Sequence, residues 1–492
     1  GALAVLALAP VAAQDAVTIE FVHIFGGDGD TRADVIRAMA DRFEAENPGI
    51  TVEIRSVSTD YTETFNAALL AADQGRAPHV VQVEEGLTQL AADSGFFLPI
   101  GSLASAEQLA QLEGILPVVR DYYTIGEDVW SVPWNSSNPI VYYNKTLTDL
   151  LQVEIPADRP LTFDEVSAAC EKIMAAKTII QRLVPGFTAC ANWPMVAWFP
   201  EQWLAMQDAL MANNDNGRSA RATEMLYDSA EMLRVVEWWK SLADNGYYTY
   251  TGTPNDYNGE GSLFGTGASA IHINSTAGIT LFVAGFAQAG VKMGIAPLFV
   301  PGEDADNGVT MGGASLWVTG GHSDAETQAA VDFIFFMTQP ENDILFHQGS
   351  GYFPNRTDSI EYLSRAGLFA DADGNPIGRD GQPVVDGDWL TLLATGNLWA
   401  GALGAPPVDG AVEVSWFETF PFFRVAIDQL ANSRGTVANA GAVVGPSAEV
   451  RGILIQALQS VVDGGIAPAE ALAAAKQRAD AVLADYNALV GN

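Results

Sequence analysis

The stretch from Val132 to Lys145 constrains the fold most strongly. It reads Val-Pro-Trp-Asn-Ser-Ser-Asn-Pro-Ile-Val-Tyr-Tyr-Asn-Lys. Pro139 has a fixed φ and no N–H for a ladder hydrogen bond, so a strand can begin there but cannot run through it. Ser136 and Ser137 place hydroxyl groups directly before that strand. The stretch therefore predicts a crossover between two lobes, with hydroxyls that face a cleft.

Strands and helices alternate at the start of the chain. Residues 17–25 indicate a buried strand, and a helix with apolar residues three and four apart follows and stops at 47–49. Residues 50–54 alternate apolar and polar side chains, and a helix at 61–72 precedes a short strand at 79–83. This alternation predicts an α/β fold with a mostly parallel sheet.

Capping boxes and apolar stripes predict the later helices. The capping boxes are Thr162 with Glu165, Ser323 with Glu326, and Thr338 with Glu341. Apolar stripes predict further helices around 232–239, 453–461 and 468–486, and Gly/Ala/Pro-rich loops are expected at 401–410 and 432–445.

The chain length and the crossovers predict two lobes, each a sheet flanked by helices. Residues 269–274 are predicted to form a second crossover strand. The predicted boundaries place 14–136 and 273–330 in the first lobe, and 137–272 and 331–492 in the second.

The N-terminus and the charge balance indicate an exported protein. Ala2 to Ala13 resemble the apolar part of a secretory signal that ends in the small residues Val11-Ala12-Ala13. The net charge of −36 makes nucleic acid and anionic membrane surfaces poor partners. We therefore expect a soluble exported protein whose signal is cleaved near Ala13.

Cys170 and Cys190 are the two cysteines of the chain. An exported pair can form a disulfide, and two reduced, buried thiols are the alternative. Two cysteines and five scattered histidines match no zinc pattern. We expect no metal and no cofactor.

Polar residues follow two of the predicted strands. Glu85 comes after the strand at 79–83, and Ser275 and Thr276 come after the strand at 269–274. Ligands of open α/β sheets bind outside the carboxyl ends of the strands, so these side chains are candidates for a cleft. Ordinary loop polarity is the alternative.

Other patterns carry weaker signals. Two glycines, at 312 and 313, precede a buried strand and could admit a ligand to the backbone N–H groups, although a tight turn explains them equally well. Trp193 and Trp198 could form flat walls or belong to the core. The loop at 371–375 fails as a calcium loop, because Pro376 and Gln382 occupy the required glycine and glutamate positions.

The adjacent Glu84 and Glu85 could in principle serve a glycosidase. Neighbouring side chains of a strand point to opposite faces, however, so we expect the two carboxylates to be separated.

The chain resembles the bacterial extracellular solute-binding proteins of the sugar-binding type, family 1, over residues 17–486. The run Gly-Gly-Ala-Ser-Leu-Trp-Val at 312–318 and Asn-Ser-Ser at 135–137 are similar to the sn-glycerol-3-phosphate branch of that family. By motif position, the resemblance implies ligand contacts from Tyr61, Glu85, Ser137, Ser275, Gly313, Tyr352 and Arg451, with Trp193 and Trp198 nearest to the tryptophans that line such sites.

The resemblance implies the two-lobe, type II periplasmic binding protein fold. It implies a monomeric periplasmic binding protein, not an enzyme, that delivers sn-glycerol 3-phosphate or a glycerophosphodiester such as glycerophosphocholine to an ABC permease. Charge suggests that Arg451 holds the phosphate and that Glu85, which only accepts hydrogen bonds when ionised, faces glycerol hydroxyls. The alternatives are a sugar- or oligosaccharide-binding protein of the same fold and an exported carbohydrate-acting enzyme.

Overall fold

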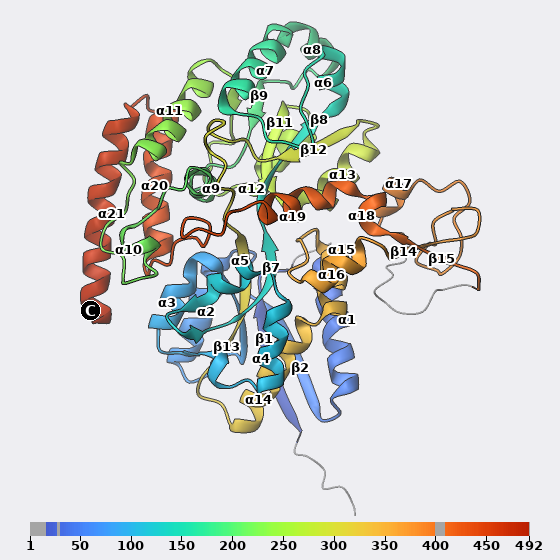
Figure 1. Cartoon of the computed structure of the whole chain (residues 1–492), viewed down its shortest axis with the longest axis vertical. Coiled ribbons are helices and arrows are strands. Elements are labelled where there is room, and N and C mark those ends of the chain that lie inside the picture. The colour runs from blue at the N-terminus through green and yellow to red at the C-terminus, as the bar shows by residue number, and fades with distance from the viewer. Residues whose placement is uncertain (1–15, 27–29, 399–408, 492) are drawn as a thin grey trace, which may run out of the picture.

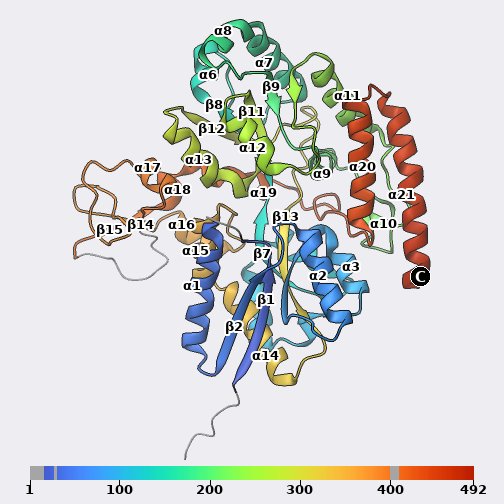
Figure 2. The same ribbon diagram turned by 180° about the vertical axis from the view of Figure 1, so that it is seen from behind.

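The computed structural model describes residues 16–26, 30–398 and 409–491. Two lobes lie one above the other, each built on a mixed sheet with helices around it (Figures 1 and 2). This confirms the predicted two-lobe α/β architecture. The predicted signal at 1–13 and most of the loop predicted at 401–410 lie outside the described residues.

The sheet of the first lobe has the order β2-β1-β3-β13-β4, and β7 also pairs with β13. Its strands are β1 (Val17–His23), β2 (Ile50–Ser56), β3 (Val80–Glu84), β4 (Phe97–Leu98), β7 (Val132–Ser137) and β13 (Gly312–Thr319). β1 pairs in parallel with β2 and β3, whereas β13 runs antiparallel to β3, β4 and β7. The prediction of a mostly parallel sheet holds only for the first three strands, because β13 arrives from the other lobe.

The sheet of the second lobe has the order β10-β9-β11-β8-β12. Its strands are β8 (Pro139–Asn144), β9 (Ala189–Asn192), β10 (Tyr248–Thr249), β11 (Ser269–Ser275) and β12 (Met293–Pro297). β9 pairs in parallel with β10 and β11, and β8 lies antiparallel between β11 and β12. Two further antiparallel strand pairs lie within the described residues: β5 (Thr124–Ile125) with β6 (Asp128–Val129), and β14 (Gly367–Ala370) with β15 (Val412–Ser415).

The helices divide between the lobes. Those of the first lobe are α1 (Thr31–Glu46), α2 (Tyr61–Asp73), α3 (Thr88–Asp93), α4 (Ala106–Gln111), α5 (Pro117–Arg120), α14 (Asp324–Met337), α15 (Pro340–Ser350) and α16 (Thr357–Leu363). The others are α6 (Lys145–Leu151), α7 (Phe163–Ala175), α8 (Lys177–Leu183), α9 (Trp198–Met206), α10 (Asn213–Asn216), α11 (Ala230–Asp244), α12 (Tyr257–Gly265), α13 (Ile279–Gln288), α17 (Trp389–Ala394), α18 (Trp416–Thr419), α19 (Arg424–Ala431), α20 (Ser447–Val462) and α21 (Pro468–Val490).

The first crossover lies where the sequence places it, at Ser137–Pro139 between β7 and β8. The second does not. β11 pairs inside the second sheet, and β12 pairs with β8, so the chain returns to the first lobe only between Pro297 and Gly312. α15 packs on α1 of the first lobe. The prediction that residues 331–492 belong to the second lobe is therefore wrong for this helix.

Two of the predicted capping boxes are present. The hydroxyls of Thr162 and Ser323 each accept a hydrogen bond from the backbone N–H of the glutamate three residues later. The side chain of that glutamate in turn accepts from the backbone N–H of the capping residue. The third prediction is wrong: Thr338 ends α14 and its hydroxyl donates to the carbonyls of that helix, while Gln339 precedes α15. A hydroxyl so close to a helix end can satisfy the helix behind it instead of the one ahead.

Cys170 on α7 and Cys190 on β9 form a disulfide, which decides between the two alternatives. None of the described helices combines the length and the apolarity that crossing a membrane requires.

A buried histidine makes the stability of the second lobe depend on pH. His272 is fully buried; its Nδ1–H donates to the Asn192 carbonyl, and its Nε2 accepts from the Asn274 amide. Burial lowers the pKa of His272 to about 3. The unfolded chain takes up this proton near pH 6.5, so the group makes the protein less stable as the pH falls.

We expect His272→Gln to remove this part of the pH dependence. Between pH 7 and pH 5 the wild type should lose about 2 kcal/mol more unfolding free energy than the variant. Urea unfolding at both pH values measures the difference. An identical loss in the two proteins would show that His272 does not carry this dependence.

Candidate ligand-binding site between the lobes

Arg451 and Glu85 meet across the junction of the lobes. Glu85 opens a 3₁₀ helix directly after β3, and Arg451 lies on α20, which packs on α11 and α21 of the second lobe. Arg451 Nη2 donates to Glu85 Oε1 over 3.0 Å, and Glu85 is only 3% exposed. The structure therefore brings together two predicted site residues that are 366 positions apart.

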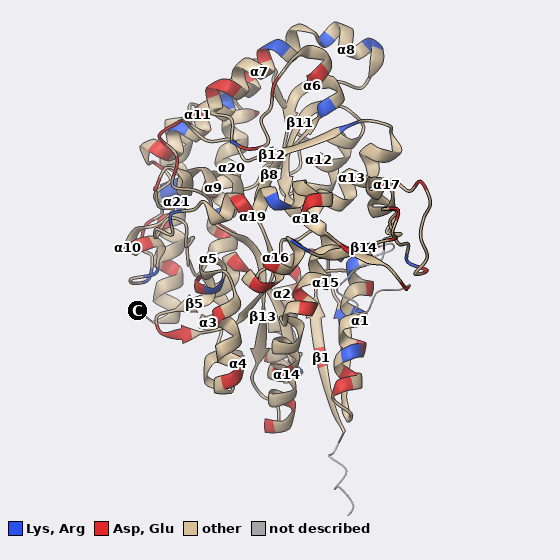
Figure 3. Cartoon of the chain, turned by 45° about the vertical axis from the view of Figure 1, so that its right-hand side comes forward, with Lys and Arg blue, Asp and Glu red and all other residues tan. Residues whose placement is uncertain are grey.

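Two further carboxylates surround the same guanidinium. Glu201 on α9 accepts from Arg451 Nε over 2.8 Å and from Nη2 over 2.7 Å. Glu84 lies 3.9 Å from Nη1. Acidic residues are also distributed over both lobes (Figure 3). The guanidinium thus faces an excess of carboxylates.

The shared burial shifts the titration of these groups. Burial raises the pKa of Glu85, although Arg451 works against the shift. Burial, together with the neighbouring Glu85, also raises the pKa of Glu84. For Arg451 the net effect of the carboxylates is a pKa well above its usual value, so the guanidinium stays charged.

Glu84 and Glu85 lie on the same side, contrary to the prediction from strand geometry. The strand ends at Glu84 and the chain turns into the 3₁₀ helix at Glu85, so the alternation of side chains stops there. Both carboxylates consequently face Arg451.

Gly313 holds Glu85 in place. Its φ is +119°, and a Cβ there would stand 2.0 Å from the Asn135 carbonyl oxygen on β7, so only glycine fits. Its N–H donates to Glu85 Oε2 over 3.1 Å. This N–H was predicted to be open to a ligand, but in the structure it is bonded to Glu85.

Tyr61 and Tyr352 form a second group on the first lobe. Their hydroxyl oxygens are 3.4 Å apart, and Asn135 Nδ2 donates to the Tyr61 hydroxyl over 2.8 Å. Tyr352 follows Gly351, which has a φ of +82°. Gly351 lies against the carbonyls of Thr276 and Ala277 in the second lobe. The tyrosine pair therefore also lies at the junction.

The predicted serines end strands that meet at the crossover. Ser137 ends β7, and Ser275 ends β11 opposite Pro139. The Ser275 hydroxyl accepts from the Ala277 N–H, which leaves its own proton free to donate.

Several buried polar atoms near this crossover have no partner within the described residues, and such atoms suit ligand contacts. They are Ser136 Oγ, Thr276 Oγ1, Thr280 Oγ1, Thr310 Oγ1 and Trp198 Nε1.

The two predicted tryptophans have different surroundings. The Trp198 ring lies against Gly312, at the start of β13, and is partly exposed. Trp193 is fully buried among Trp203, Trp238 and Tyr248. The structure brings Trp198 to the site, whereas Trp193 packs in the aromatic core of the second lobe.

Sequence reasoning missed Glu201. It follows Trp198 by three residues on α9, so the two share a helix face, and that spacing was the available signal. Asn135 was noted only as part of the crossover motif, but it bonds Tyr61 and Gln82.

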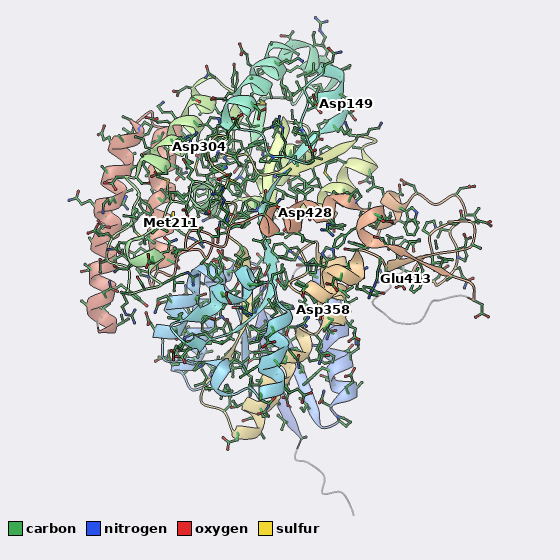
Figure 4. The ribbon with its side chains drawn as sticks, in the orientation of Figure 1. Asp149, Met211, Asp304, Asp358, Glu413 and Asp428 are labelled. Atoms are coloured by element: carbon green, nitrogen blue, oxygen red, sulfur yellow. A yellow bond between two sulfur atoms is a disulfide. The ribbon has the colours of Figure 1, made fainter. Side chains whose placement is uncertain are left out.

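The lobes are closed on each other around these residues. Arg221 from the second lobe donates two hydrogen bonds of 2.7 Å to Asp93 on α3, and the Tyr486 hydroxyl of α21 donates to the same carboxylate. A cavity of about 10 Å³ borders Glu201, Thr310 and Met211, the last labelled in Figure 4. Such a volume holds about one water molecule.

His79, His322 and Glu326 form a group with the composition of a metal site, at the end of the first lobe. The backbone N–H of Glu20 donates to His79 Nδ1 over 2.9 Å, so the proton of a neutral His79 resides on Nε2. That nitrogen then has no lone pair to offer, and the group does not fit a metal as it stands.

The family model described as "Bacterial extracellular solute-binding protein" matches residues 38–371. The chain belongs to this family. Its members are solute-binding proteins, not enzymes, and the family implies a small-molecule ligand and an ABC permease as partner.

Curated relatives and solved structures agree with this assignment. The sn-glycerol-3-phosphate-binding periplasmic protein UgpB of Pectobacterium atrosepticum is 25% identical over 75% of this chain and 80% of its own length. UgpB of Escherichia coli K12 is 25% identical over 73% of this chain and 78% of its own length.

UgpB of Mycobacterium tuberculosis in complex with glycerophosphocholine has a TM-score of 0.67 and 20% identity, with 96% of this chain and 99% of that one covered. The GacH receptor of Streptomyces glaucescens, solved with acarbose, also has a TM-score of 0.67, with 18% identity and coverage of 95% and 98%. These structures share the fold, but between them they bind different ligands.

We expect Arg451→Ala to destabilise the protein in a pH-dependent way. Removing the cation leaves buried carboxylates unpaired, which costs roughly 3–5 kcal/mol. Without the cation the pKa values of these carboxylates in the folded protein rise further. Protonation at low pH therefore reduces the loss of unfolding free energy, and the loss grows as the pH rises. Urea unfolding of wild type and variant at pH 5 and pH 8 measures it. A loss of equal size at both pH values would mean that the carboxylates stay ionised.

Proposed function

We propose that this chain is the periplasmic substrate-binding protein of an ABC importer that captures sn-glycerol 3-phosphate or a glycerophosphodiester such as glycerophosphocholine. The ligand lies between the lobes, which close around it, and the protein delivers it as a monomer to the permease of the inner membrane. The observation that carries the proposal is the partly buried guanidinium of Arg451 beside Glu85, which the Gly313 N–H holds, at the motif positions of the glycerol-phosphate branch.

The ligand contacts in this proposal come from both lobes. Tyr61, Glu85, Ser137 and Tyr352 belong to the first lobe, where the Gly313 N–H holds Glu85, and Trp198, Ser275 and Arg451 belong to the second. Arg451 Nη1 makes no hydrogen bond to the carboxylates, so it can donate to a phosphate oxygen together with the serine hydroxyls. Glu85 accepts hydrogen bonds and faces the glycerol hydroxyls.

A sugar or oligosaccharide is the second candidate, and one observation favours it. Three carboxylates face a single guanidinium, and the Trp198 ring borders the site. Carboxylates accept hydrogen bonds from sugar hydroxyls, and an uncharged ligand would not be repelled by them.

Isothermal titration distinguishes the two candidates. We expect saturable one-to-one binding of sn-glycerol 3-phosphate or glycerophosphocholine, and no heat with maltose. Arg451→Lys keeps the charge but loses Nη1 and the two-pronged pairing with Glu201 that orients it, so it should weaken phosphate binding at least tenfold, or about 1.4 kcal/mol. Binding of maltose alone would assign the chain to the sugar-binding relatives.

The exposed pair Arg234–Asp304 provides the matched control. Arg234→Lys makes the same chemical change on the surface of the second lobe and should leave the affinity unchanged.

A further inference from the structure

Glu201 engages Arg451 more fully than any other carboxylate of the described structure does. It accepts from Nε and from Nη2, over 2.8 and 2.7 Å, in the two-pronged geometry that suits a guanidinium best. Glu85 takes one further hydrogen bond of 3.0 Å from Nη2. Only Nη1 keeps its donors for another group.

Glu201 and Arg451 belong to the same lobe. α9 and α20 both pack against α11, so the pair stays together when the lobes separate. Glu84 and Glu85 belong to the first lobe and approach Arg451 when the lobes close. A ligand therefore meets a guanidinium that Glu201 has already neutralised, and closure then brings up two more carboxylates.

The consequence depends on the charge of the ligand. A phosphomonoester carries about −1.5 to −2 charges near neutral pH, since its second pKa is about 6. A phosphodiester has no second proton to lose and carries a single charge. The repulsion from the surrounding carboxylates grows in proportion to the ligand's charge, so the monoester is penalised more than the diester.

We propose that Glu201 determines the charge selectivity of the site: by holding the Arg451 guanidinium, it disfavours a dianionic phosphomonoester relative to a monoanionic phosphodiester. This inference rests on the proposed function. It adds that the physiological ligand belongs to the glycerophosphodiester class, and that the discrimination resides in a residue which contacts the cation and need not contact the ligand.

Glu201 could instead serve only to position Arg451. A positioning role predicts that its loss weakens both kinds of ligand equally. Charge selectivity predicts that its loss changes the ratio of the two affinities, and that the change depends on the protonation of the monoester.

The experiment compares wild type and Glu201→Gln by isothermal titration with two probes, sn-glycerol 3-phosphate and sn-glycero-3-phosphoglycerol. The second probe is a monoanionic diester without a cationic group, so it differs from the first in charge without adding a positive one. The titrations are made at pH 7.5 and at pH 5.5, where the monoester is mostly monoanionic.

At pH 7.5 the variant should bind the monoester at least tenfold better relative to the diester than the wild type does. At pH 5.5 this gain should shrink to less than threefold. Glu201→Asp keeps the charge and should keep the wild-type ratio. Titration of the protein's own groups affects both probes, so the ratio isolates the charge of the ligand.

Asp304→Asn is the matched control. Asp304 lies in the second lobe (Figure 4) and forms an exposed pair with Arg234, so the substitution removes one negative charge away from the site. It should leave the ratio unchanged.

Equal weakening of both probes by Glu201→Gln would reduce Glu201 to a positioning residue and overturn the inference, as would an unchanged ratio. If wild type binds neither phosphate probe but binds maltose, the proposed function itself fails and the inference falls with it.

Discussion

The partly buried charge of Arg451 is the constraint on which the rest of the junction depends. A guanidinium removed from water must be paired and hydrogen-bonded, because an isolated charge in a protein interior is strongly unfavourable. Glu201 from the same lobe and Glu85 from the other lobe meet that requirement. The contact with Glu201 lies within the second lobe, whereas the contact with Glu85 joins the lobes, so closure adds further carboxylates to a cation that is already paired.

The path of the backbone follows from this arrangement. Glu85 accepts the Gly313 N–H, and Gly313 can approach β7 closely only because it has no side chain. β7 then passes through Ser137 and Pro139 into the other sheet. The crossover, the glycine and the carboxylate thus form one continuous unit, in which a side chain at 313 would push β13 away from β7.

The comparisons show how little the fold alone says about the ligand. Structures with nearly equal TM-scores were solved with glycerophosphocholine and with acarbose. The fold is common to them, whereas the ligand is selected by the side chains of the site. In this chain those side chains include one guanidinium and three carboxylates, so the charge balance of the site is the property that separates the candidate ligands.

The amino-acid sequence by itself determined the local structure. Apolar periodicity located the first strands and helices, Thr162 and Ser323 marked helix starts, and Pro139 marked the first crossover. The family motifs located Glu85, Gly313 and Arg451, which the structure brings together. These features depend on residues close in the chain, or on patterns that a family shares.

Only the tertiary structure decided the remaining features. In the structure the second crossover is the segment between β12 and β13. Thr338 ends α14 and bonds its carbonyls instead of capping α15, and Trp193 lies in the core. It also revealed Glu201, which lies 250 residues from its partner Arg451. Which carboxylates face a cation depends on how separate helices pack and how the lobes close, and local periodicity carries no information about either.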